Sequence, residues 1–91
     1  MDRERAHRLW QAVLEQREVP ERPVEWEPLL SLWRGAGATA ADGERLSAAL
    51  RGATDPLQRR AALVRQARRL IREAGLDPDL LSTPAAPMRG L

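Results

Sequence analysis

Five residue types are missing from this chain of 91 residues: cysteine, lysine, phenylalanine, tyrosine and asparagine. Without cysteine, the chain can form neither a disulfide scaffold nor a cysteine-ligated zinc or iron site. The other four missing types, and isoleucine, which occurs once as Ile71, have AT-rich codons. We therefore infer a gene of high GC content, in which basic positions become arginine, and expect a bacterial, cytoplasmic protein. The abundance of arginine is then not by itself evidence of nucleic-acid binding.

Long apolar runs are also missing. No stretch approaches the roughly 18 apolar residues that a membrane-spanning helix needs. Residues 1–8 are too highly charged to form the apolar core of a signal peptide. The 15 basic residues, all arginine, exceed the 13 acidic residues by a net charge of only +2. We expect no membrane partner.

Aromatic residues are limited to three tryptophans, Trp10, Trp26 and Trp33. A domain of this size buries only about 60 to 65% of the surface that its unfolded chain exposes. Leucine, alanine and valine must supply most of the remaining core. We expect the tryptophans to form part of this core; the alternative is that Trp26 is exposed as an anchor for a partner protein.

What the sequence does contain is helical periodicity. Apolar residues at the spacing i, i+3, i+4, i+7, i+8 predict a first helix from Asp2 to Val19. Pro20 and Pro23 end this helix and predict an extended connection from Val19 to Trp26, because a residue before proline is pushed out of the helical region.

Two shorter helices follow. The second is predicted from Pro28 to Arg34, with glycines as its C-terminal stop. The third begins either at a capping box of Thr39 with Asp42 or at Asp42 itself, and ends near Gly52.

The last long helix has the clearest boundaries. Asp55 is its N-cap, Pro56 occupies its first position and Gly75 follows its end, so the helix is predicted from Pro56 to Ala74. A further turn is predicted from Asp79 to Leu81. The expected fold is all-α: a small helical bundle of three to four helices, with residues 1–81 as a single domain and residues 82–91 as a flexible C-terminal tail.

The last long helix should be amphipathic and basic. On a helical wheel, a broad apolar face forms from Leu57, Ala61, Leu63, Val64, Ala67, Leu70, Ile71 and Ala74. Beside it, at the spacing i, i+3, i+4, i+7, lie Arg65, Arg68, Arg69 and Arg72. Four guanidinium groups within two turns repel one another and gain from a shared anionic partner. We therefore predict that these arginines bind a nucleic-acid backbone or another anion; the alternative is a solvated face that pairs with acids of the first helix or of the segment from Glu18 to Glu27.

The short second helix is apolar on nearly all sides. It is either central to the core or a docking surface for a partner. The residues that would bind this partner are Trp26, Leu29, Leu30 and Trp33.

Catalytic and metal sites have no support in the sequence. The acidic cluster of Glu18, Glu21, Glu25 and Glu27 lacks the aspartate, asparagine and glycine turn of hard-cation sites. His7 is the single histidine, which makes a poor metal ligand without a second one. We expect no catalytic residue, no metal and no cofactor.

These patterns favour a non-catalytic small helical subunit or adaptor of a larger protein or ribonucleoprotein assembly, which contacts a nucleic-acid backbone or an acidic protein surface through its arginine-rich helix. Because the side chains that would face bases are almost only arginine, with only Gln58 and Gln66 to read adenine, phosphate contact without sequence readout is favoured. The alternative is a pure protein-interaction or homo-oligomerisation domain with no nucleic-acid role.

Overall fold

The computed structural model describes residues 1–81, and within this range every regular element is a helix. The elements are α1 (Arg3–Glu15), a 3₁₀ helix η1 (Pro23–Trp26), α2 (Glu27–Gly35), α3 (Ala40–Arg51), α4 (Pro56–Glu73) and the single turn α5 (Pro78–Leu81). The all-α prediction is confirmed. The predicted C-terminal tail, residues 82–91, lies outside the described residues.

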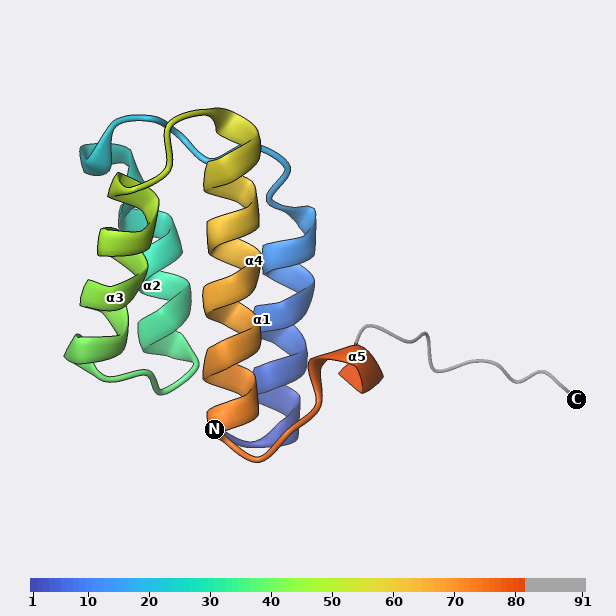
Figure 1. Cartoon of the computed structure of the whole chain (residues 1–91). Helices are drawn as coiled ribbons and strands as arrows, with labels where there is room; N and C mark the ends of the chain where they lie inside the picture. Colours follow the sequence, from blue (N-terminus) through green and yellow to red (C-terminus); the bar gives the residue numbers. More distant parts are fainter. Residues whose placement is uncertain (82–91) are drawn as a thin grey trace, which may run out of the picture.

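The four longer helices form a closed ring of neighbours. α1 packs on α2 and α4, and α3 packs on α2 and α4, whereas the diagonal pairs are not in contact. The helices run in alternating directions, so that α1 and α4 lie antiparallel and side by side (Figure 1). The first and the last long helices therefore close the bundle, and α5 packs on both of them.

Hydrogen bonds at the helix N-termini explain why the helices begin where they do. The Asp2 carboxylate accepts the Arg5 N–H at 2.8 Å, and the Asp55 carboxylate accepts the Gln58 N–H at 2.7 Å. Each bond satisfies a backbone donor that the first turn of a helix leaves without a partner.

The capping box of α3 is present as predicted. The Thr39 hydroxyl accepts the Asp42 N–H at 3.2 Å, and an Asp42 carboxylate oxygen accepts the Thr39 N–H at 3.0 Å. Thr39, and not Asp42, is therefore the N-cap. The bond from the Thr39 N–H lowers the pKa of Asp42 below its ordinary value.

The first helix and the connection after it differ from the prediction. α1 ends at Glu15 instead of Val19. The Gln16 side chain donates to the Glu18 carbonyl at 2.6 Å, and Val19 turns inward until it is 2% exposed. The predicted extended connection also contains a turn of helix, because Pro23 starts η1 at its first position.

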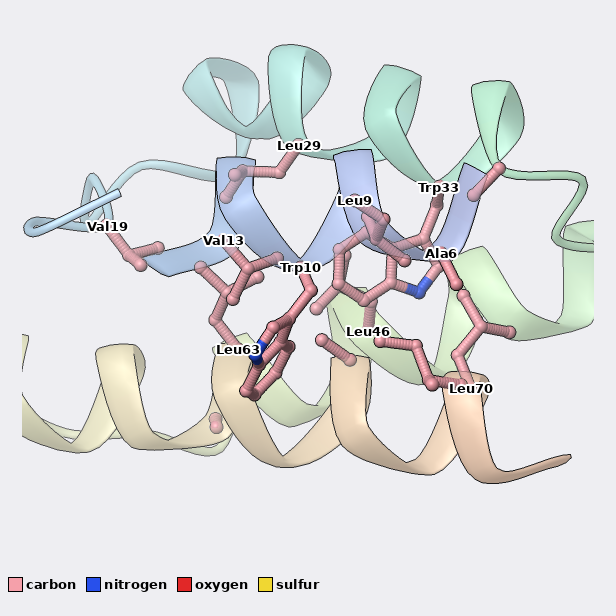
Figure 2. Close-up of a cluster of buried hydrophobic side chains, with 14 of the residues drawn as sticks. Ala6, Leu9, Trp10, Val13, Val19, Leu29, Trp33, Leu46, Leu63 and Leu70 are labelled. Carbon is pink, nitrogen blue, oxygen red and sulfur yellow. The ribbon is translucent and has the colours of Figure 1, made fainter. Parts of the chain in front are cut away.

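The core lies along the axis of the bundle, and Figure 2 shows the Trp10 ring reaching from α1 toward α4. Every long helix contributes to this cluster, with Val13 from α1, Trp33 from α2, Leu46 from α3 and Leu63 from α4 among the least exposed side chains. The α4 side chains in the core are Ala62, Leu63, Ala67, Leu70 and Ile71, joined by the buried Arg59.

This burial pattern makes a prediction about two leucines of the same helix. Leu63 is 0% exposed and Leu57 is 80% exposed. We expect Leu63→Ala to lower the free energy of unfolding by about 2–5 kcal/mol, because it removes buried methyl groups and leaves a cavity. Leu57→Ala, the matched control, should change it by no more than about 0.5 kcal/mol. Urea unfolding followed by circular dichroism measures both, and equal losses would contradict the described orientation of α4.

Candidate functional site

The outward face of α4 is the side of the helix opposite the core; within residues 1–81 no long helix packs on it, and α5 contacts it where Asp79 binds Arg68. α1 and α3 flank α4 on either side (Figure 1). At 3.6 residues per turn, the positions opposite the core form a strip along the helix. We define this outward face by its members, which are Leu57, Ala61, Val64, Arg65, Arg68 and Arg72.

A groove of about 690 Å³ runs along this face. Its alkyl surface comes from Leu57 and Ala61, which are exposed, and Val64, which is half-buried. The rest of its lining is charged and consists of Arg60, Arg65, Arg68, Arg69, Arg72 and Glu73. An apolar strip open to solvent is therefore bordered by guanidinium groups.

The structure brings the four predicted arginines together on α4 but divides them into two pairs. Arg68 donates to the Asp79 carboxylate of α5 at 2.9 Å, and Arg69 donates to Glu73 at 3.1 Å. Within residues 1–81, Arg65 and Arg72 form neither a hydrogen bond nor an ion pair, and both are exposed. Five arginines of the groove face two carboxylates, Glu73 and Asp79, which leaves an excess of three positive charges.

Three of the acids that the sequence analysis proposed as alternative partners of these arginines form ion pairs elsewhere. Ion pairs join Glu4 to Arg8, Glu25 to Arg22 and Glu27 to Arg34. Within residues 1–81, the ion pairs of the α4 arginines are those with Glu73 and Asp79, and none joins α4 to an acid of the first helix or of the segment from Glu18 to Glu27.

Arg68 is the arginine of this face that is held most firmly. Its guanidinium carbon lies 5.9 Å from the centre of the Trp10 ring, while the Asp79 carboxylate binds it from α5. A guanidinium over an indole face gains from the ring quadrupole. Arg68 thus links α4 to both α1 and α5, and its side chain remains 28% exposed.

The ion pair of Arg68 shifts the pKa of its partner. The hydrogen bond from Arg68 lowers the pKa of the Asp79 carboxyl below the ordinary 3.8, and the charges of Arg68 and Arg72 act in the same direction. Because the folded pKa lies below the unfolded value, the interaction stabilises the fold above pH 3.8 and is lost as the pH falls through the folded pKa.

Two arginines that the sequence analysis did not single out anchor the start of α4. Arg59 is 8% exposed and donates through Nε to the Val19 carbonyl at 3.1 Å. Arg60 donates to the Leu14 carbonyl at 3.2 Å. Both acceptors lie at or just beyond the end of α1, where carbonyl groups lack helical partners. No sequence pattern distinguishes these two arginines from the outward ones, since their acceptors are more than 35 residues away.

The predicted apolar face of α4 was too broad. Leu57, Ala61 and Ala74 are exposed and Val64 is half-buried, although the helical wheel grouped all four with the core side chains. Tertiary packing is the reason, because the neighbouring long helices cover only the flanks and the inner side of α4. Ala62, which was not assigned to the apolar face, packs against the rest of the core instead.

The second predicted site is not a surface. Trp26, Leu29 and Trp33 are each 2% exposed and belong to the core of the chain, and Leu30 is half-buried against it. The Trp26 indole N–H donates to the Pro20 carbonyl at 2.7 Å, which fixes the ring inside. A partner cannot reach these three side chains in the folded domain, so the docking surface expected on the second helix is corrected to a core segment.

The described residues provide no candidate metal site and no candidate membrane span. Between residues 1 and 81, no group of three or more histidine, cysteine, aspartate or glutamate side chains is placed to hold a metal ion. No helix in this part of the chain is both long and apolar enough to cross a bilayer. His7 lies exposed on α1.

Comparison with known proteins finds no family model, no curated protein and no solved structure that matches this chain. The outward face of α4 is therefore the feature of this chain from which a function can be inferred.

The contact between Arg68 and Asp79 can be tested by titration. Carbon-detected NMR of the Asp79 carboxyl should give a pKa below 3.8 in the wild-type protein. In Arg68→Gln the value should rise toward 3.8, because the largest cause of the shift is removed. Arg69→Gln is the matched control and should leave the Asp79 pKa unchanged, since Arg69 pairs with Glu73. An Asp79 pKa that is insensitive to Arg68→Gln would contradict the ion pair.

Proposed function

We propose that this protein is a non-catalytic binding module of a larger assembly, and that it takes an acidic partner on the outward face of α4. The observation that carries the proposal is the combination of an apolar strip open to solvent with five arginines along its borders. Neither feature alone would be distinctive, because scattered exposed leucines and surface arginines are ordinary.

The charge of the face supports an anionic partner. Arg65 and Arg72 lie about 10 Å apart along the helix axis, given a rise of 1.5 Å per residue, and Arg68 and Arg69 lie between them. Two like charges 10 Å apart in water repel one another by about 0.4 kcal/mol before salt screening. A partner that brings carboxylates or phosphates to Arg65 and Arg72 relieves this repulsion.

The apolar strip favours an acidic protein surface over a nucleic-acid backbone. Phosphates and sugars gain nothing from the alkyl groups of Leu57, Ala61 and Val64. A protein partner buries them, at about 25 cal/mol for each Å² removed from water. Protein interfaces combine such an apolar centre with a polar rim, and arginine is enriched in them.

Self-association through the second helix, the alternative weighed from the sequence, has no comparable support. Trp26, Leu29 and Trp33 would have to leave the core to reach a second copy. Catalysis is not part of the proposal, because the side chains around the groove are alkyl groups and arginines with a single glutamate, Glu73.

The salt dependence of binding tests this function. Labelled poly-L-glutamate is titrated with the protein between about 50 and 200 mM NaCl, the range over which contacts to charged polymers weaken steeply. We expect the affinity to fall with salt. Arg65→Gln combined with Arg72→Gln should weaken binding by roughly two- to thirtyfold and flatten the salt slope, because exposed ion pairs contribute about 0.2–1 kcal/mol each.

A matched control removes the same charge elsewhere. Arg22→Gln with Arg34→Gln changes two exposed arginines at η1 and α2, which do not pack on α4. This variant should keep the wild-type slope. Equal slopes for all three proteins would show that the site is wrongly assigned, and tighter binding of an oligo-dT strand, unaffected by Leu57→Ser, would favour the nucleic-acid function instead.

A further inference from the structure

The outward face of α4 differs between its two halves. The alkyl groups of Leu57, Ala61 and Val64 lie in the N-terminal half, whereas Arg65, Arg68 and Arg72 follow in the C-terminal half. From Leu57 to Arg72 the face spans about 22 Å along the helix axis. A ligand that fits both halves at once must be apolar at one end and acidic at the other.

We infer that the occupant is an amphipathic helix of another protein, with acidic residues in its first turns and apolar residues in its later turns, lying antiparallel to α4. This inference rests on the proposed function and adds to it the form, chemistry and direction of the partner. The acidic turns face Arg65 and Arg72, and the apolar turns cover Leu57, Ala61 and Val64.

The spacing of the face fits a helix better than an extended peptide. The alkyl groups recur at i, i+4 and i+7, and the arginines Arg65, Arg68 and Arg72 recur at i, i+3 and i+7. A second helix repeats side chains at the same intervals, so its ridges can lie between those of α4 over the whole length. An extended strand repeats the side chains of one face about every 6.7 Å, against about 6 Å for i, i+4 residues of α4, so its match drifts out of register along the face.

The flank of the face beside α3 also allows a helix to approach closely. A second groove between α3 and α4 shares Ala61 and Arg65 with the first. Its other lining residues include Ala49, Gly52 and Ala53, which have small side chains or none. The two grooves therefore border one another at Ala61 and Arg65, and the small side chains on the α3 side leave room beside the face.

The direction follows from electrostatics. Carboxylates stabilise a helix when they lie in its first turn, where the backbone N–H groups are positive. An acidic segment that faces the C-terminal half of α4 is therefore placed best at the N-terminus of the partner, which makes the two helices antiparallel. In α5, too, an acidic residue of the first turn, Asp79, binds an arginine of this face, Arg68.

A second copy of this chain is a poorer occupant. Each groove carries five arginines and one glutamate, so two outward faces in contact would bring together ten arginines and two glutamates. The acids that would be needed lie on other faces, where Glu4, Glu25 and Glu27 are already paired. The charge balance favours a different chain.

Two synthetic peptides of identical composition test the inference on the full-length protein. Each is an 18-residue amphipathic helix with blocked termini; one carries its glutamates in the first two turns and its leucines in the later turns, and the other has the reverse sequence. Fluorescence anisotropy measures both affinities. We expect the acid-first peptide to bind about tenfold more tightly, since several carboxylates then lie at the favourable helix end.

Variants of the protein locate the contact. Leu57→Ser should weaken the acid-first peptide about tenfold by removing an apolar group that the partner buries. Leu57 is 80% exposed, so the fold should be retained, which circular dichroism confirms. Val24→Ser is the matched control, because Val24 is 73% exposed on η1, away from α4, and it should leave the affinity unchanged.

The remaining outcomes each overturn a defined part of the inference. Equal binding of both peptides, or tighter binding of the reversed one, overturns the antiparallel direction. Poly-L-glutamate that binds as tightly as the peptides, without any effect of Leu57→Ser, overturns the helical partner and leaves the proposed function standing. Dimers in sedimentation that dissociate in Leu57→Ser overturn the choice of occupant. No binding of peptides, poly-L-glutamate or oligo-dT overturns the inference and the proposed function together.

Discussion

The packing of α4 between α1 and α3 is the constraint on which the other features of this domain depend. It turns Leu63, Ala67 and Ile71 into the core, and within residues 1–81 it leaves the opposite strip without a long helix packed on it. The same orientation brings Arg59 to the carbonyl group of Val19 and Arg68 to the ring of Trp10. The rotation of α4 about its own axis thus determines both which of its side chains stabilise the core and which charged side chains are exposed.

The sequence was sufficient for features that depend on a few neighbouring residues. The Thr39 and Asp42 capping box, the Asp55 N-cap and the stop at Gly75, whose φ of 84° suits glycine, are all local signals. The early end of α1 was missed because the inward turn of Val19 is favoured by distant core contacts. The exposure of Leu57 and Ala61 was missed because a helical wheel groups residues by angle but does not say which directions other helices cover.

The arginines show the same limit of prediction from local sequence, because some of their partners lie far away along the chain. Arg69 and Glu73 stand four residues apart on one helix, so their ion pair could be expected from spacing alone. Arg68 instead reaches Asp79 through the turn at Gly75, and Arg59 reaches a carbonyl 40 residues away. The identity of these residues as arginine says nothing about which of them stabilise the fold. Only their positions in the bundle separate those with partners from Arg65 and Arg72.

The closed ring of helices also has a consequence for how the chain acquires its structure during synthesis. α1, α2 and α3 leave the ribosome before α4, but the stripe of α1 that carries Trp10 and Val13 is completed only by α4. Until residues near Ile71 emerge, this apolar stripe lacks its counterpart and stays in contact with water. Joining the first helix to the last requires closure of a loop of some 40 residues, whose entropic cost rises only slowly with length. Cooperative folding therefore has to wait for almost the whole domain.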